Sequence, residues 1–218
     1  FRAEILQKLN LQSWGMEFAS EMVIKASREG LKIKEVPITY YPRGSPSKLS
    51  SFSDGWRHLR FILLLKPMPF LTIPGILCTF FGLILMAAFY ASANDPTGRL
   101  HSFILGAILI SGGLQLFLSG ILIKVYSVIH GFEKRVGFIV DLLNYHTLER
   151  FLAVGIVLTL VGLLVGVFIL KSWISTGFGE LAQIGNAVLS LLLIIIGLEV
   201  AFTTVFISMM CINDETSP

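Results

Sequence analysis

The sequence has 218 residues, of which 54% are hydrophobic and only 14% charged, with a net charge of +3. A soluble domain carries about 25% charged residues, so this composition excludes an ordinary soluble globule, and it also excludes intrinsic disorder. The small net charge predicts no nucleic-acid partner. The two cysteines, Cys78 and Cys211, are too few for a disulfide framework and lack the spacing of metal ligands, so we interpret them as small apolar packing residues in their long apolar runs.

The first predicted element is a helix over residues 14–30. Glu21 and Lys25 have the spacing of a favourable ion pair, and Gly30 is a candidate C-cap. The chain begins at Phe1 without the features of a signal peptide, so we expect the natural N-terminus to lie upstream. The apolar residues of this helix recur at spacings of three and four: Phe18, Met22, Val23 and Ala26.

Residues 31–40 alternate between apolar and polar side chains and predict a β-strand. Pro37 places that strand at a sheet edge or at a bulge. A helix followed by a strand is typical of an α/β domain, and residues 1–50 are too few to form one alone. We therefore interpret residues 1–50 as the C-terminal piece of an α/β domain.

A loop rich in Gly, Pro and Ser follows, and it carries Arg43 and Lys48 with Ser45 and Ser47 between them. Cations and hydroxyls on a loop are suited to binding phosphate oxygens. The alternative is a solvated basic loop beside a membrane, where basic residues are common.

Residues 51–67 predict an amphipathic helix lying in the headgroup region. Arg57, His58 and Arg60 point away from its apolar stripe, and Trp56 serves as an interfacial anchor. A second interfacial segment is predicted at about residues 127–150, centred on Phe132–Leu148. The stripe of the first helix consists of Phe52, Trp56, Leu59 and Leu63.

The third part, residues 68–218, is predicted to be a four-helix transmembrane domain. Each of its four apolar runs is about 20 residues or longer, which is enough to cross roughly 30 Å of hydrocarbon as a helix. The runs are Phe70–Tyr90, Phe103–Val125, Phe151–Leu170 and Ile184–Cys211.

Basic residues alternate between the connecting segments. Residues 1–67 hold eleven Lys or Arg, the loop after the first span holds one, the next loop four, the next one, and the tail none. By the positive-inside rule, both chain ends are predicted to face the cytoplasm.

Two features inside the spans have open interpretations. Gly162 and Gly166 form a GxxxG pair, a spacing that permits close helix contact and is compatible with a homo-oligomer. Glu199 is the only carboxylate deep in a span, and it is either functional or a hydrogen-bonded glutamate between helices.

Four short motifs in residues 14–63 resemble family 2 glycosyltransferases of the polyprenyl-phosphate type, which include dolichyl-phosphate mannosyltransferase-like enzymes. Two later segments, Tyr145–Arg150 and Trp173–Gly179, resemble the same family. Pro46 departs from the family pattern before the Ser-Lys-Leu of the loop. The four motifs are G-x-E-F-x-x-E (Gly15, Glu17, Phe18, Glu21), Glu35–Ile38, Arg43 with Ser47-Lys48-Leu49, and Asp54–Leu59.

The resemblance implies a cytoplasmic GT-A domain, interfacial helices and membrane helices. It implies transfer of a sugar from a nucleotide sugar to a polyprenyl or dolichyl phosphate at the cytoplasmic face, with a divalent metal, Mg²⁺ or Mn²⁺. The family's metal-binding Asp-x-Asp motif is absent from this sequence, whose aspartates are Asp54, Asp95, Asp141 and Asp214. We therefore expect no catalytic residue and no metal ligand here, and expect this chain alone to be inactive.

Six residues are candidate binding residues. Arg43 and Lys48, assisted by Ser47, are expected to contact donor or acceptor phosphates. Arg57 and Arg60 are expected to position the lipid phosphate. Glu17 either orients the acceptor side of the pocket or caps the first helix.

Two other functions compete with this hypothesis. One is a non-catalytic membrane module whose four helices and basic collar anchor or assemble a partner. The other is a small transporter, for which only Glu199 and Asn186 provide polar groups within the spans.

Overall fold

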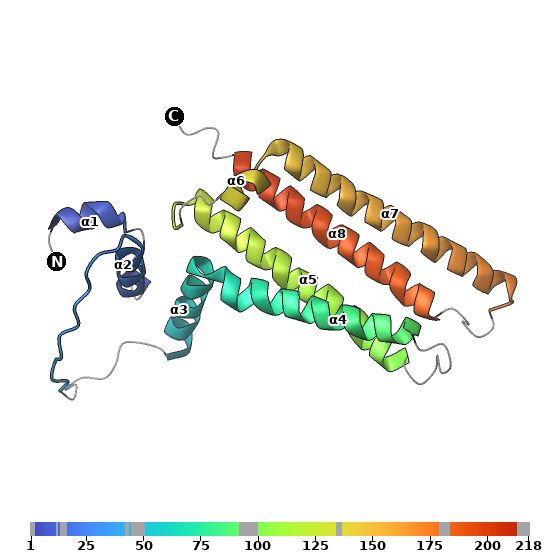
Figure 1. Ribbon diagram of the computed structural model, residues 1–218, viewed down its shortest axis with the longest axis horizontal. Helices are drawn as coiled ribbons and strands as arrows, with labels where there is room; N and C mark the ends of the chain where they lie inside the picture. Colours follow the sequence, from blue (N-terminus) through green and yellow to red (C-terminus); the bar gives the residue numbers. More distant parts are fainter. Residues whose placement is uncertain are drawn as a thin grey trace. The chain divides into compact units, whose positions relative to one another are not determined.

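The computed structural model describes residues 3–11, 13, 17–41, 44, 51–91, 100–133, 137–178 and 184–212, and every regular element among them is a helix (Figure 1). The chain divides into two compact units, Phe1–Leu63 and Leu64–Pro218. Each unit is described by itself below.

The first unit contains α1 (Ala3–Leu9), α2 (Glu17–Arg28) and most of α3 (Ser51–Leu65). The predicted C-cap of α2 is confirmed. Gly30 has a φ of +65°, and the Leu31 amide donates to the Ala26 carbonyl at 3.0 Å. This hydrogen-bond pattern ends a helix with a left-handed residue, a conformation that glycine adopts without a steric penalty.

The predicted strand over residues 31–40 is wrong. Residues 31–41 have no regular secondary structure, and residues 32–41 are exposed. A strand is stable only when its backbone is paired with a neighbouring strand, and no described segment of this chain supplies such a neighbour. The α/β piece predicted for residues 1–50 is therefore not evident in the described part of the chain.

The second unit contains four helices long and apolar enough to cross a membrane, as predicted. A short π-helix, η1 (Met68–Thr72), leads directly into α4 (Ile73–Ala91). Pro67 and Pro69 lie where the missing amide hydrogen costs least, at the helix start. The other three spans are α5 (Leu100–Ile129), α7 (Tyr145–Ser175) and α8 (Ile184–Ile212).

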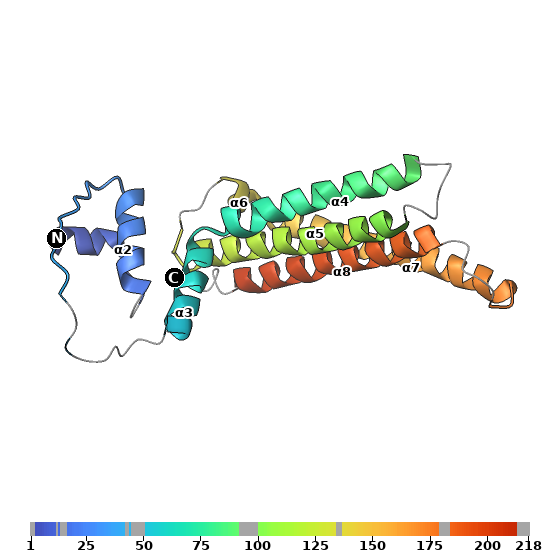
Figure 2. The same cartoon turned by 90° about the horizontal axis from the view of Figure 1, so that it is seen from below.

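The four spans form two hairpins that lie side by side, in the order α4, α5, α8, α7 (Figures 1 and 2). Helices α4 and α5 form one antiparallel pair, and α7 and α8 form the other. Helices α5 and α8 run in the same direction, and they make the contact between the two hairpins.

Small residues spaced by seven hold each hairpin together. A Cβ added to Gly113 of α5 would lie 2.6 Å from the Thr79 amide nitrogen of α4 and 2.7 Å from the Gly75 carbonyl oxygen. A Cβ added to Gly197 of α8 would likewise lie 2.6 Å from both the Thr159 nitrogen and the Gly155 oxygen of α7. Backbones therefore touch backbones in both hairpins, which is how transmembrane helices pack most closely.

The two hairpins are an internal repeat. The segment GILCTFFGL, residues 75–83, matches GIVLTLVGL, residues 155–163, at both glycines, the threonine, the isoleucine and the last leucine. Each threonine donates to the glycine four residues earlier, Thr79 to Gly75 and Thr159 to Gly155, and both distances are 2.9 Å.

The GxxxG pair is only part of the seam between α7 and α8. Gly162 contacts Ile194 and the Ser190 carbonyl, and Ser190 donates back to the Gly162 carbonyl at 2.7 Å. Gly166 lies against the Ser190 hydroxyl. Both glycines of the pair therefore face a helix of the same chain.

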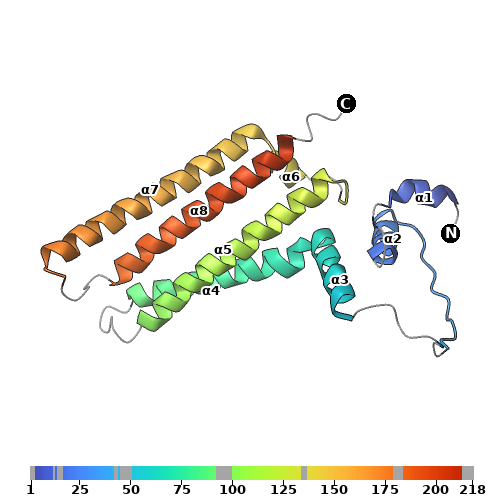
Figure 3. The same cartoon turned by 180° about the vertical axis from the view of Figure 1, so that it is seen from behind.

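One short helix is described within the predicted second interfacial segment. Helix α6 (Gly137–Leu142) is the one regular element described between α5 and α7 (Figure 3). Leu142 is buried with Val125, Leu148 and Ile207, because its apolar side packs onto the ends of the spans. Glu133 pairs with Lys124 at the end of α5.

Candidate functional site

Helix α3 carries an open apolar stripe with two arginines at its flank. Phe52 is 90% exposed and Trp56 58% exposed, as expected for side chains directed at lipid. Because each helical residue turns by about 100°, Arg60 lies beside that stripe, and Arg57 lies about 60° farther round the helix. Both arginines are exposed.

The opposite side of α3 faces protein. Phe61 is buried, and the His58 ring nitrogen Nε2 lies 3.3 Å from the Ser20 hydroxyl of α2 within the first unit. Helix α3 therefore has a buried side at Phe61, an exposed apolar stripe, and two exposed arginines between them.

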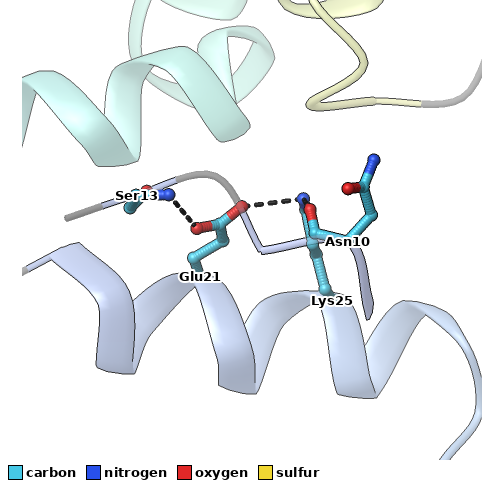
Figure 4. A network of polar contacts seen from close by, with 4 residues as sticks. All are labelled: Asn10, Ser13, Glu21 and Lys25. Carbon is cyan, nitrogen blue, oxygen red and sulfur yellow. Dashed lines mark hydrogen bonds and ion pairs between the residues drawn. The ribbon is translucent and has the colours of Figure 1, made fainter. Parts of the chain in front are cut away.

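A buried ion pair fixes the start of the first unit (Figure 4). Glu21 and Lys25 form the predicted pair at 2.7 Å, and Glu21 is completely buried. Glu21 also accepts from the Ser13 amide at 2.7 Å, and Lys25 donates to the Asn10 carbonyl at 2.6 Å. The pair therefore ties the segment after α1 onto α2.

This network gives the second glutamate of the G-x-E-F-x-x-E motif a structural role that the sequence reasoning missed. Glu17, the first glutamate, is the first residue of α2 and is half-buried. A carboxylate in the first turn interacts favourably with the helix dipole, which agrees with its capping interpretation. Its acceptor-side interpretation stays a prediction.

The structure places three of the six candidate residues, Glu17, Arg57 and Arg60, and brings only the last two together. Arg43, Ser47 and Lys48 lie outside the described residues. Among the residues described, no three His, Cys, Asp or Glu side chains gather to hold a metal ion. The described residues therefore do not fit the divalent metal implied by the resemblance, and no metal-dependent step is assigned to them.

A pocket of about 360 Å³ lies between α7 and α8, at the end of the spans where the chain enters η1. Leu148 and Leu152 form part of its apolar wall, and Tyr145 and Glu149 part of its polar rim. His146 Nδ1 lies 3.6 Å from Glu149 Oε2 on the exposed surface of α7. The sequence reasoning placed these residues in the second interfacial segment but predicted no pocket, although Tyr145, Leu148, Glu149 and Leu152 share one helix face through their spacing of three and four.

The opposite end of α7 is closed by aromatic residues. The Trp173 and Phe178 rings meet edge to face at 5.1 Å, and Gly177 has a φ of +71°. Aromatic side chains are enriched where a membrane meets water, so this end of α7 has the composition of a second interface.

These features define an integral, multi-pass membrane domain preceded by an amphipathic cationic helix. Residues 121–211 match the family model for the glycosyltransferase family 2 C-terminal transmembrane region. The chain is 33% identical to the low-salt glycan biosynthesis hexosyltransferase Agl6 of Haloferax volcanii, over 205 residues. That match covers 93% of this chain and 49% of the hexosyltransferase, so the chain spans about half of that relative.

A second relative is an uncharacterised protein of Shigella flexneri, 32% identical over 120 residues that cover 51% of this chain and 73% of that protein. No solved structure matches the chain. The chain belongs to the family 2 glycosyltransferases and corresponds to their C-terminal portion.

Proposed function

We propose that this chain is the membrane and acceptor-binding part of an enzyme that transfers a hexosyl group from a nucleotide sugar to a polyprenyl or dolichyl phosphate. The Haloferax relative is a hexosyltransferase, which supports the sugar class. The main support for the acceptor class is helix α3, which combines an exposed apolar stripe with two exposed arginines, Arg60 beside the stripe and Arg57 one step farther round the helix.

This helix is suited to a lipid phosphate for two reasons. The stripe of α3 anchors the helix in the headgroup plane, where the phosphate of a polyprenyl phosphate also lies. Guanidinium groups bind phosphate oxygens through paired hydrogen bonds, and they do so most strongly where water is partly excluded. Helix α3 ends three residues before the first span, so the chain itself holds the arginines close to the bilayer.

The chemistry of the acceptor explains why binding residues are sufficient on this side of the reaction. A phosphate oxygen is already ionised near neutral pH, so no strong general base is needed. It forms a bond to the anomeric carbon while the bond from that carbon to the nucleoside diphosphate breaks, and the diphosphate leaves with the electron pair. The contribution of Arg57 and Arg60 is to position the nucleophile.

In this proposal the reaction takes place at the cytoplasmic face. The eleven Lys and Arg before the first span, against one in the following loop, support this orientation. The divalent metal and the nucleotide sugar belong, in this proposal, to a nucleotide-binding part of the enzyme outside this chain. The 218-residue chain alone is therefore expected to bind the acceptor without transferring sugar.

The test is transfer of radiolabelled sugar by membranes that contain the full-length gene product, with polyprenyl phosphate or the matching polyprenol as acceptor. Label in the phosphate lipid alone is the expected result. The Arg43→Glu variant is expected to lose most of the transfer while still inserting into membranes. Equal labelling of both lipids would contradict the acceptor class, and no labelling of any lipid would favour the non-catalytic anchoring module.

A further inference from the structure

A polar pocket of about 310 Å³ lies between α5 and α8 at mid-depth of the second unit. Gln115 and Ser119 of α5 and Glu199 and Thr203 of α8 line it. Fifteen residues of α5 precede Gln115 and fourteen follow it, and fifteen residues of α8 precede Glu199 and thirteen follow it. The pocket is therefore near the centre of the hydrocarbon region.

The polar groups of this pocket are poorly satisfied within the chain. Ser111 donates to Glu199 Oε1 at a long 3.4 Å, and Oε2 of the same carboxyl is buried and has no hydrogen-bond partner among the described residues. The Gln115 side chain is exposed, and it makes no hydrogen bond within the described part of the chain. Hydrocarbon offers the exposed Gln115 amide no partner, so this amide is costly unless another protein surface satisfies it. Glu199 Oε1, whose hydrogen bond to Ser111 is long, can accept a second one.

The polar residues of the pocket occupy equivalent positions in the two repeated hairpins. The offset that aligns Gly113 with Gly197 also aligns Gln115 with Glu199. It aligns Ser119 with Thr203 in the same way. Each hairpin thus contributes an amide or carboxyl group followed four residues later by a hydroxyl. Both pairs line the same pocket between α5 and α8.

We propose that this pocket is the contact surface for a second copy of the chain, with the Gln115 amide of each copy donating to the Glu199 carboxyl of the other. Two copies inserted in the same orientation have these residues at the same depth. A two-fold axis along the membrane normal then brings each amide to a carboxyl, as an isologous interface requires. Such polar groups join transmembrane helices by hydrogen bonds across the interface.

The surroundings of the pocket fit a helix rather than a polar small molecule. Leu198, Phe202 and Phe206 line it as well, and they are 41%, 60% and 53% exposed. Large apolar side chains around a polar centre are typical of the well-packed core of a protein interface. This proposal rests on the second unit alone and does not depend on the proposed enzymatic function.

The experiment is disulfide cross-linking of the full chain in membranes, with Cys78 and Cys211 replaced by alanine. The Thr203→Cys variant is expected to give an oxidised dimer. The Val154→Cys variant is the matched control, because Val154 is 51% exposed and adjoins Gly155, which lies against Ala201, two residues from Thr203. Equal cross-linking of both variants would show random collision and would overturn the proposal.

A second set of variants distinguishes loss of the intermolecular hydrogen bond from misfolding of the chain. Adding Gln115→Leu or Glu199→Leu to the Thr203→Cys variant is expected to lower the dimer fraction about ten-fold, since both copies lose the bond. Adding Glu199→Gln, which retains hydrogen-bonding capacity, is expected to preserve it. An unchanged dimer fraction in the leucine variants, or cross-links only to other proteins, would overturn the assignment. Single-molecule photobleaching of the labelled chain in nanodiscs counts the copies directly, and a single copy per nanodisc would also overturn it.

Discussion

Gly197 packs so closely against Thr159 that a Cβ on the glycine would lie 2.6 Å from the threonine amide nitrogen. The same relationship recurs between Gly113 and Thr79 in the other hairpin. Because both contacts involve backbone atoms, neither can be relieved by rotating a side chain. The two seams therefore fix how each hairpin is packed.

Gly113→Ala is expected to destabilise the membrane unit by about 1–3 kcal/mol, because α4 and α5 must move apart to admit the methyl group. The matched control is Gly112→Ala, since a Cβ at Gly112 meets nothing within 4 Å. That control is expected to be neutral, or stabilising by about 0.5–1 kcal/mol through helix propensity. Thermal unfolding in detergent measures both variants, and equal stability would contradict the backbone-to-backbone seam.

The spans were predictable from the sequence because a long apolar run has only one stable form in a bilayer, a helix. Their pairing was not predictable from GxxxG, because the seams use small residues spaced by seven, such as Gly155 and Gly162. That spacing, and the match of residues 75–83 to residues 155–163, were visible in the sequence.

The predicted strand over residues 31–40 failed for a different reason. Alternating apolar and polar residues indicate which side chains would share a face. A strand also needs a neighbouring strand, which the local sequence does not specify. The stripe and arginines of α3 were predictable because they depend only on helical periodicity. The burial of Glu21 was not, since it depends on how the segment after α1 packs onto α2.

The Glu21→Gln substitution is expected to cost the first unit about 3 kcal/mol, because Lys25 loses its ionised neighbour in a buried place. Glu35→Gln is the control for the lost charge, since Glu35 lies in an exposed segment. Limited proteolysis of the full chain is expected to cut residues 1–30 faster in Glu21→Gln only. Equal cleavage of the two variants would show that the buried ion pair is not needed.

Trp56 is expected to lie at headgroup depth. With Trp14 and Trp173 replaced by phenylalanine, the remaining fluorescence should be quenched more strongly by lipids brominated near the headgroup than by lipids brominated near the chain end. Quenching that is absent, or strongest at the chain end, would contradict an interfacial α3.

The orientation is testable by labelling with a membrane-impermeant maleimide, in the background in which Cys78 and Cys211 are alanine. The exposed positions Asp141, on α6, and Thr176, after α7, lie at opposite ends of the second unit. The Thr176→Cys variant is expected to be labelled in intact cells, and the Asp141→Cys variant only after permeabilisation. The reverse pattern would place both chain ends outside.

The most direct test of the central claim is the KM of the full-length gene product for polyprenyl phosphate, compared between Arg57→Glu/Arg60→Glu and Arg57→Lys/Arg60→Lys. If helix α3 holds the acceptor phosphate, charge reversal should raise the acceptor KM at least about ten-fold, corresponding to roughly 1.4 kcal/mol of lost binding, and leave the KM for the nucleotide sugar unchanged. The acceptor KM of the lysine variant should lie between that of the glutamate variant and that of the natural enzyme. An unchanged acceptor KM after charge reversal would contradict the claim that Arg57 and Arg60 bind the lipid phosphate.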